Sequence, residues 1–141
     1  LLVCSQNIKN TLINSCRGLI YSTALPNPTV IFLDLALQHI IKNPSKGQKL
    51  ITKANNLRKT LENLAFKVLG NSHILPILME NTQSCINASK YLIKNNLYIL
   101  PIVHPTVPKL APRLRISLTL NHKEEDLNLL TKSLTTIKNY A

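Results

Sequence analysis

Residues 101–119 read PIVHPTVPKLAPRLRISLT, and the last seven, Arg113–Thr119, alternate strictly between polar and apolar side chains. Successive side chains of a strand point to opposite faces, so this alternation is typical of a strand with one buried face. The face toward the core would carry the three apolar residues, Leu114, Ile116 and Leu118. The opposite face would carry the polar ones, Arg113, Arg115, Ser117 and Thr119. The stretch therefore predicts a half-buried strand that presents two guanidinium groups side by side.

The arginine pair suits the binding of an anion. Arg keeps its charge and offers a planar fork of donors that matches a carboxylate or phosphate in bidentate fashion. The strand follows Pro105, Pro108 and Pro112, whose fixed φ angles predict a stiff, extended approach that holds the hydroxyl of Thr106 near the strand. Arginines on an exposed strand are also an ordinary solvated surface, so the pattern alone leaves both interpretations open.

The neighbouring segments predict a small domain of the α/β (α+β) type. We expect strands at 74–79 and 97–103 and helices at 82–95 and from Asn121 onward, where Asn121 and Glu124 have the spacing of a capping box. Pro76 would place the first strand at a sheet edge or a bulge. The predicted fold is a small, mainly antiparallel sheet with helices packed on one face.

The first half of the chain predicts helices that lead into this domain. We expect helices at 6–16, from Asn27 or Thr29 through 41, and at 45–69, the last ended by Gly70. Residues 30–41 leave almost no polar face, which predicts a helix packed on several sides.

An extended passage is expected at 17–28, and its tip carries the adjacent hydroxyls of Ser22 and Thr23. Hydroxyls beside backbone N–H groups can hold a phosphate. A Ser/Thr turn before a helix produces the same pattern, so the residues alone do not decide between the two.

Composition restricts the classes of function. The chain has 141 residues, enough for one domain with a modest core, and its formal net charge of +11 raises nucleic-acid binding as a hypothesis. However, the lysines are spread over nearly every segment, and the aromatic residues on which bases stack make up only 4% of the chain. These features argue against specific nucleic-acid binding.

Neither disulfides nor a metal site is expected. The three cysteines, Cys4, Cys16 and Cys85, and the four histidines lie at wide spacings that fit no ligand set. The most apolar segment, 30–41, is shorter than the roughly 20 residues of a membrane span, and no signal-peptide pattern opens the chain. We therefore expect a cytoplasmic protein without a membrane partner.

Two stretches resemble a known family. Residues 104–130, HPTVPKLAPRLRISLTLNHKEEDLNLL, resemble the C-terminal signature of the α-oxoamine synthases, which use pyridoxal 5′-phosphate (PLP), and 21–26, YSTALP, is similar to the family's Y-S-T-x-x-P stretch. The resemblance covers essentially the whole chain and is weaker in the helices between. His104, Leu110 and Pro112 depart from the family pattern, and they bear on the geometry at the two arginines.

The resemblance implies roles for five residues. Arg115 would bind the carboxylate of an amino-acid substrate, Arg113 is a second candidate for the same work, and Thr106 would contact substrate. Ser22 and Thr23 would reach the PLP phosphate of the partner subunit in a homodimer.

The resemblance also implies the activity, which is a PLP-dependent acyl transfer between an amino acid and an acyl thioester. It assigns residues 1–28 to the tail of a large PLP-binding domain, 29–70 to linking helices and 71–141 to a C-terminal small domain. The family's Schiff-base lysine and other catalytic groups lie upstream of the matched region. We therefore expect no catalytic residue in this chain, which would be a fragment inactive by itself.

Other hypotheses stay open beside this one. They are a sibling activity within the family, a stand-alone binding or dimerisation module, and a basic nucleic-acid binder. If a large domain normally covers the linking helices, apolar area around Val30–Leu37 should be exposed in the isolated chain and should drive self-association.

Overall fold

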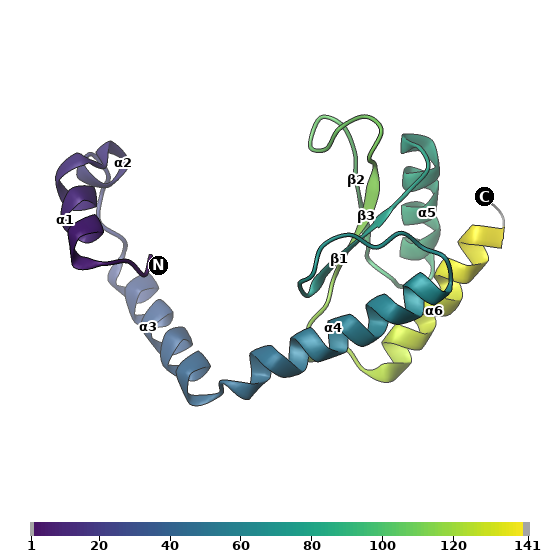
Figure 1. Cartoon of the computed structure of the whole chain (residues 1–141), viewed down its shortest axis with the longest axis horizontal. Helices are drawn as coiled ribbons and strands as arrows, with labels where there is room; N and C mark the ends of the chain where they lie inside the picture. The colour runs from purple at the N-terminus through teal and green to yellow at the C-terminus, as the bar shows by residue number, and fades with distance from the viewer. Residues whose placement is uncertain (1, 140–141) are drawn as a thin grey trace. The chain divides into compact units, whose positions relative to one another are not determined.

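The computed structural model describes residues 2–139 and divides the chain into two compact units, one up to Lys42 and one from Asn43 onward. The first unit contains α1 (Gln6–Ser15), α2 (Arg17–Ile20) and α3 (Asn27–Lys42), which are labelled in Figure 1. Ser5 caps α1, because its side chain accepts a hydrogen bond from the backbone N–H of Ile8.

The prediction of an extended passage at 17–28 is wrong for its first residues, which form α2. The backbone N–H of Tyr21 donates to the carbonyl of Arg17 at 3.0 Å, and Gly18 does not interrupt this turn. A local turn satisfies backbone groups that an unpaired extended segment would leave to water. Pro28 is tolerated in the first turn of α3, where a missing N–H loses no intrahelical bond.

No residue of α3 is buried, so the prediction that this helix is packed on several sides is wrong for the chain as described. The first unit holds too few other residues to cover a helix that is apolar all round. The accompanying expectation of exposed apolar area around Val30–Leu37 is confirmed, since Phe32 is 71% exposed and Leu35 is 59% exposed. A contiguous exposed apolar surface of this kind indicates a contact surface.

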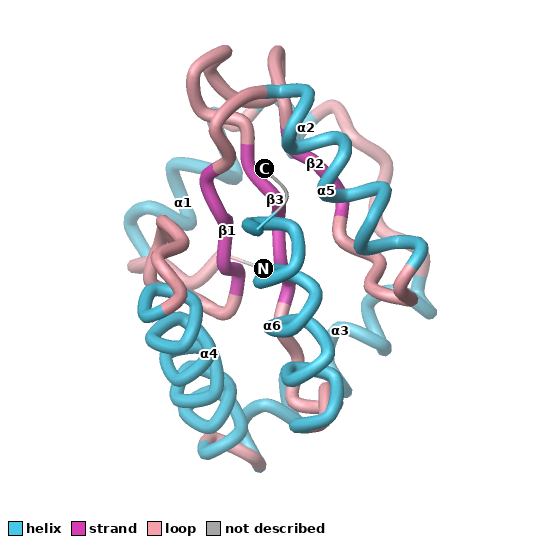
Figure 2. Tube along the Cα trace, turned by 90° about the vertical axis from the view of Figure 1, so that its right-hand side faces the viewer, coloured by secondary structure: helices cyan, strands magenta, loops and turns pink. Residues whose placement is uncertain are grey.

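In the second unit, the described helices pack on one face of the sheet and leave the other face without a helix. This unit contains α4 (Ser45–Asn63), β1 (Ile74–Leu78), α5 (Thr82–Lys94), β2 (Leu100–Ile102), β3 (Arg113–Ser117) and α6 (Glu124–Asn139). The three strands pair antiparallel in the order β1-β3-β2. In Figure 2, α6 lies in front of β1 and β3, with α4 and α5 on either side. The predicted fold class is confirmed.

The core lies between the sheet and these helices. The alternation along β3 is confirmed, because Leu114 is 0% exposed and Ile116 is 5% exposed, whereas Arg115 and Ser117 are exposed. On the helices, the buried contributions include Ala54, Leu57, Leu61, Cys85, Ala88, Leu92, Leu130 and Leu134. Pro76 lies in β1 at the edge of the sheet, which its missing N–H favours.

The long helix α4 ends at Asn63 rather than near Gly70. Ala65 takes a positive φ of 59°, and the chain then runs beside β1, where the N–H of Leu78 donates to the carbonyl of Lys67 at 2.9 Å. The otherwise open edge of β1 provides backbone partners that a longer helix could not use. Gly70, with φ 74°, instead serves the turn into β1.

The second predicted strand is shorter than expected. Residues 95 and 96 form a turn after α5 and residues 97–99 have no regular structure, so β2 begins only at Leu100; the N–H of Leu97 donates to the carbonyl of Leu92 at 2.9 Å. Asn96 has a positive φ of 61°, which redirects the chain between α5 and β2.

The capping box predicted at Asn121 and Glu124 does not form. Helix α6 begins at Glu124, and the N–H of Lys123 donates to Asp126 Oδ2 at 2.7 Å. The residues between β3 and α6 instead form a turn in which the N–H of Thr119 donates to His122 Nδ1 at 3.0 Å. The helix therefore starts two positions later than the pattern predicted. The side chain of Asp126, instead of that of Glu124, accepts the hydrogen bond from the backbone N–H that precedes the helix.

We expect Asp126→Ala to lower the free energy of unfolding by about 1 kcal/mol, because it removes the side-chain acceptor at the start of α6. Asn121→Ala should change it by less than about 0.5 kcal/mol, since Asn121 is exposed. Urea denaturation followed by circular dichroism would measure both. A larger loss in the Asn121 variant would contradict this assignment of the cap.

Candidate functional site

Arg115 lies in the middle of the sheet on the face without helices. It is on the central strand, opposite Pro76 of β1 and Leu100 of β2. Its side chain is exposed, and it has no hydrogen-bond or ion-pair partner among residues 2–139. An Arg held on a paired strand with all of its side-chain donors unused is suited to bind a carboxylate or a phosphate.

Arg113 lies on the same face but is used differently. Its Nε donates to the carbonyl of Ala111 at 3.0 Å, and the side chain is half-buried. This bond ties the guanidinium to the chain that enters β3, so Arg113 has fewer donors to offer than Arg115.

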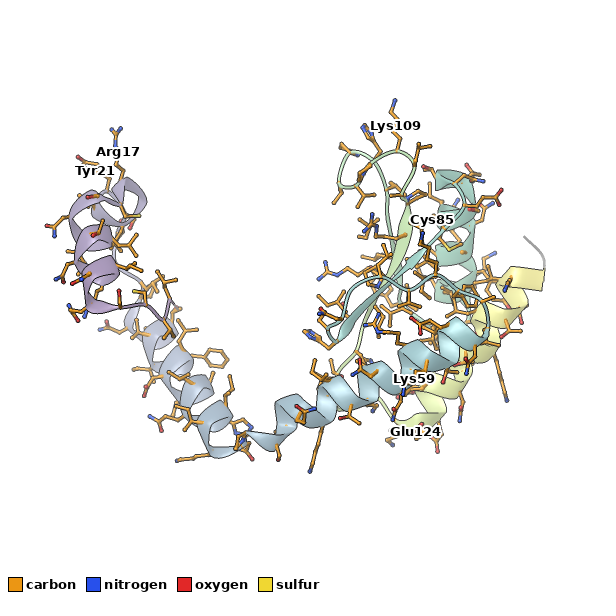
Figure 3. The ribbon with its side chains drawn as sticks, viewed as in Figure 1. Arg17, Tyr21, Lys59, Cys85, Lys109 and Glu124 are labelled. Carbon is orange, nitrogen blue, oxygen red and sulfur yellow. The ribbon has the colours of Figure 1, made fainter. Side chains whose placement is uncertain are left out.

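Thr106 lies in the loop between β2 and β3, which is not the extended approach that the prolines predicted. The N–H of Thr106 donates to the carbonyl of Val103 at 3.0 Å, and the N–H of Ala111 to that of Pro108 at 2.9 Å. Two successive turns result, because proline also favours the corner positions of turns. Thr106 is exposed. Figure 3 shows Lys109 at the far end of this loop, pointing away from the sheet.

A cavity of about 500 Å³ lies beside Arg115 within the second unit. Its polar lining includes Arg115, Tyr98, Ser117, His122 and Asp126, and its walls are mainly apolar side chains from the 97–102 segment, β3 and α6. Thr106 and Arg113 are not among its lining residues. The structure thus brings Arg115 together with two residues, Tyr98 and His122, that the sequence analysis did not select.

Sequence reasoning had one signal for Tyr98 and none for His122. Tyr98, Leu100 and Ile102 alternate along the chain, and all three line the cavity. This agrees with the two-residue period of side chains in an extended segment. His122 lies after the strand in a turn whose geometry no local pattern predicted.

Ser22 and Thr23 are both exposed and lie in the first unit. Ser22 Oγ donates to the carbonyl of Leu19 at 3.1 Å, which leaves the oxygen able to accept. Figure 3 shows Arg17 and Tyr21 next to each other just before them, with the guanidinium 6.0 Å from the ring centre. Their assignment to a phosphate stays a prediction.

Two side chains of α5 contact the backbone of β2 and of the residue just before it. Ser89 Oγ donates to the carbonyl of Ile99 at 2.6 Å, and the sulfur of Cys85 is bonded to the backbone of Ile102. Figure 3 shows Cys85 on α5, on the side toward the strands. These bonds fix β2, and through its pairing they also support the backbone at Arg115.

Burial raises the pKa of the Cys85 thiol above its ordinary value of 9.0, and the hydrogen bond from Ile102 only partly opposes this effect. A raised pKa in the folded state means that the neutral thiol stabilises the fold at pH values below the pKa of the unfolded chain, and that this contribution is lost as the pH rises through the folded pKa. We expect the wild-type chain to lose more stability above about pH 9 than Cys85→Ala does. Urea denaturation of both proteins across this range would measure the difference, and parallel curves would contradict it.

The described residues contain neither a cluster of metal ligands nor a helix that could span a membrane. Within 2–139, no group of three or more His, Cys, Asp or Glu side chains is placed to hold a metal ion. Over the same residues, no helix has both the length and the apolar character needed to cross a membrane.

Comparisons with known proteins agree on one family. Residues 1–134 match the model of the family described as aminotransferase class I and II. A curated relative, 8-amino-7-oxononanoate synthase of Haemophilus ducreyi, is 34% identical over 128 residues, which are 90% of this chain and 33% of the relative. The chain spans about a third of the length of the curated relatives it matches. The resemblance inferred from the sequence is confirmed at the level of the family.

Solved structures share the fold. An 8-amino-7-oxononanoate synthase from Francisella tularensis superposes with a TM-score of 0.76 at 20% identity, over 96% of this chain and 40% of that chain. A serine palmitoyltransferase from Sphingomonas wittichii gives a TM-score of 0.84 at 18% identity, over 98% of this chain and 35% of that chain. At these identities the structures support the architecture only.

Proposed function

The chain belongs to the aminotransferase class I and II family, and we propose that it is part of a PLP-dependent acyltransferase. Within that family we propose 8-amino-7-oxononanoate synthase activity, the decarboxylative condensation of L-alanine with pimeloyl-CoA or a pimeloyl-carrier protein in biotin biosynthesis. The curated relatives with this name support the assignment. In this enzyme residues 71–141 would be the small domain, joined by 29–70 to a large domain that ends in 1–28.

The observation that carries the proposal is Arg115, an unpartnered guanidinium on a rigid central strand beside a largely apolar cavity. A bidentate pair with Arg115 would fix both the position and the orientation of a substrate carboxylate. Orientation matters because it decides which bond of the amino acid is set to break. Thr106 and Arg113 would assist at the loop end of the same strand.

The residues present suit the phosphate of the cofactor. Ser22 and Thr23 provide adjacent exposed hydroxyls; that of Thr23 can donate to a phosphate oxygen, and that of Ser22 would do so in place of its bond to the carbonyl of Leu19, by the resemblance across a homodimer. When bound, PLP supplies the electron sink for the carbanion chemistry, and the protein supplies binding and orientation. No residue of this chain is assigned to proton transfer.

The test is an assay of the full-length enzyme that contains this chain. The purified protein, saturated with PLP, would be supplied with L-alanine and a pimeloyl thioester, and 8-amino-7-oxononanoate would be measured by mass spectrometry. Formation of this product supports the proposal. Formation of 5-aminolevulinate or 2-amino-3-oxobutyrate from other substrates would instead identify a sibling activity of the same family.

The exposed helix α3 leads to a prediction about the isolated chain. We expect the chain to self-associate through this helix, because Phe32 and Leu35 are mostly exposed and apolar. The double variant Phe32→Lys, Leu35→Lys should be monomeric at concentrations where the wild type is not, as measured by sedimentation velocity. Gln38→Lys, on the same helix, is the control that adds charge without removing apolar area. A wild-type chain that stays monomeric at high concentration would contradict the prediction.

A further inference from the structure

A second cavity lies between α5 and α6, which are neighbours in Figures 1 and 2. Its apolar walls are formed by Met79, just after β1, by Ala88 and Tyr91 of α5 and by Ile137 of α6. Its volume is about 220 Å³, below the roughly 300–1,000 Å³ of most small-molecule sites. The cavity therefore suits an apolar side chain of a protein partner better than a free ligand.

The polar groups that line this cavity are largely engaged within their own helices. Ser84 Oγ belongs to the capping box at the start of α5. Asn87 Oδ1 accepts from Gln83 Nε2 at 2.9 Å, and Thr136 Oγ1 donates to the carbonyl of Lys132 at 3.1 Å. What the cavity offers to a partner is therefore mainly apolar contact.

Lysines of both helices flank the cavity. Lys94 follows Lys90 by four residues and Tyr91 by three, spacings that place side chains on one face of a helix. Lys132 lies one turn before Thr136, which lines the cavity. Lys90, Lys94 and Lys132 are exposed, and their ammonium groups have no partner among residues 2–139. The cavity and these three lysines together are called the α5–α6 groove below.

Within the described part of the chain, no acid pairs with the lysines of the groove. Helix α5 contains no Asp or Glu, and the acids of α6 are confined to its first turn, 124–126. Glu80 lies before the start of α5, at the opposite end of that helix from Lys94. By contrast, Lys53 and Lys138 are each bonded to a backbone carbonyl. An apolar floor with a positive rim complements an acidic amphipathic helix that buries an apolar side chain.

The groove lies along the same side of α6 as the cavity beside Arg115. Leu130 lines that cavity and Ile137 lines the groove. Residues at this spacing share one side of a helix, and they are separated by about 10 Å along its axis. A partner seated in the groove can therefore pass a flexible chain to the Arg115 cavity without leaving its docking position.

We propose that the α5–α6 groove docks the carrier protein that brings the acyl thioester. The inference rests on the proposed function, which admits either CoA or a carrier protein in this role. The groove favours the protein, because its lysines can pair with acidic side chains while an apolar side chain fills the cavity. The base of a nucleotide such as CoA needs hydrogen-bond partners, and the polar groups of the cavity are largely used. The acyl group would reach the Arg115 cavity on the flexible arm of the carrier.

The test compares two forms of one acyl group on the full-length enzyme saturated with PLP. One form is pimeloyl-CoA, and the other is the pimeloyl thioester of an acidic acyl carrier protein. The triple variant Lys90→Glu, Lys94→Glu, Lys132→Glu should lower kcat/KM for the carrier thioester by about tenfold or more, because three attractive charge pairs become repulsive. For the CoA thioester, kcat/KM should change by less than about twofold, since salt screens these distant charges.

A second triple variant is the matched control. Lys49→Glu, Lys59→Glu, Lys67→Glu makes the same change in charge at exposed lysines outside α5 and α6, and should leave both values within about twofold of the wild type. Tyr91→Ala tests the apolar part of the groove. It should lower kcat/KM for the carrier thioester by about three- to tenfold and leave the CoA value unchanged.

Fluorescence anisotropy of a labelled carrier protein without its acyl group measures docking in the absence of turnover. The affinity of the wild-type enzyme should fall as salt rises, and the groove variant should bind about tenfold more weakly at low salt. If neither thioester gives product, the proposed function is refuted, and this measurement still decides whether the carrier docks in the groove.

Losses restricted to the carrier protein and to variants of the groove support the proposal. Equal losses with both thioesters, equal losses in the control variant, or no binding of the carrier by the wild type overturn it. Equally tight binding of an unrelated acidic protein also overturns it, because charge alone would then explain the association. Each of these results leaves the acyltransferase assignment intact as long as pimeloyl-CoA gives the product.

Discussion

Replacing Arg115 by Ala is expected to lower kcat/KM of the full-length enzyme for its amino-acid substrate by about 10²- to 10³-fold. Removing one partner of a desolvated, hydrogen-bonded charge pair costs about 2–5 kcal/mol, and about 1.4 kcal/mol corresponds to a factor of ten. The prediction depends on the central position of Arg115 and on its lack of a side-chain partner among residues 2–139. Steady-state kinetics with varied amino acid would measure it.

Two further variants test whether the bidentate geometry and the position both matter. Arg115→Lys keeps the charge but loses the planar fork, so its loss should be intermediate. Arg113→Ala should have a smaller effect, because the Arg113 Nε is already bonded to the carbonyl of Ala111. If Arg113→Ala costs as much as Arg115→Ala or more, the carboxylate has been assigned to the wrong arginine.

Leu114→Ala is expected to lower the free energy of unfolding by about 3–5 kcal/mol. Leu114 is 0% exposed on the central strand, so its truncation would leave a cavity between the sheet and the helices. The surrounding strands and helices can close such a cavity only partly. Urea denaturation, fitted to a two-state transition, would measure the loss.

Leu110→Ala is the matched control, since Leu110 is 93% exposed in the loop before the same strand. The same chemical change there should alter the free energy of unfolding by less than about 0.5 kcal/mol. Similar losses in both variants would mean that the loop packs against the domain, contrary to the described structure.

Much of the second unit could be predicted from local patterns. The alternation at 113–119 correctly separated buried Leu114 and Ile116 from exposed Arg115, because one side of every strand in a single-layered sheet must face the core. Pro76 was expected at an edge or a bulge, and β1 is an edge strand of the sheet.

The errors concern places where backbone groups find partners other than those that the local pattern predicted. Helix α4 was predicted to continue past Asn63, but the following residues pair with β1, whose open edge no local pattern reveals. The capping box at Asn121 was plausible by spacing, but the turn held by Thr119 and His122 moves the start of α6 to Glu124. In the first case a bond to another segment replaced the local one, and in the second case a different local bond did so.

The family resemblance identified Arg115, Thr106 and Arg113, but local sequence could not rank them. Only the folded chain shows that the Arg113 Nε donates to the carbonyl of Ala111, while Arg115 has no partner within the described part of the chain. The spacing of the histidines was tested only against metal-ligand patterns, and such spacing carries no information on whether His122 lies near Arg115.

The sequence by itself determined which residues of β3 are buried, the class of fold and the placing of two guanidinium groups on one strand, because these depend on periodicity and side-chain chemistry within short segments. The tertiary structure alone decided where α4 and α6 begin or end, which arginine is available, and that Arg115, Tyr98 and His122 border one cavity. The physical reason is that hydrogen bonds and cavities form between segments far apart in the chain, and their partners are chosen only when the sheet assembles.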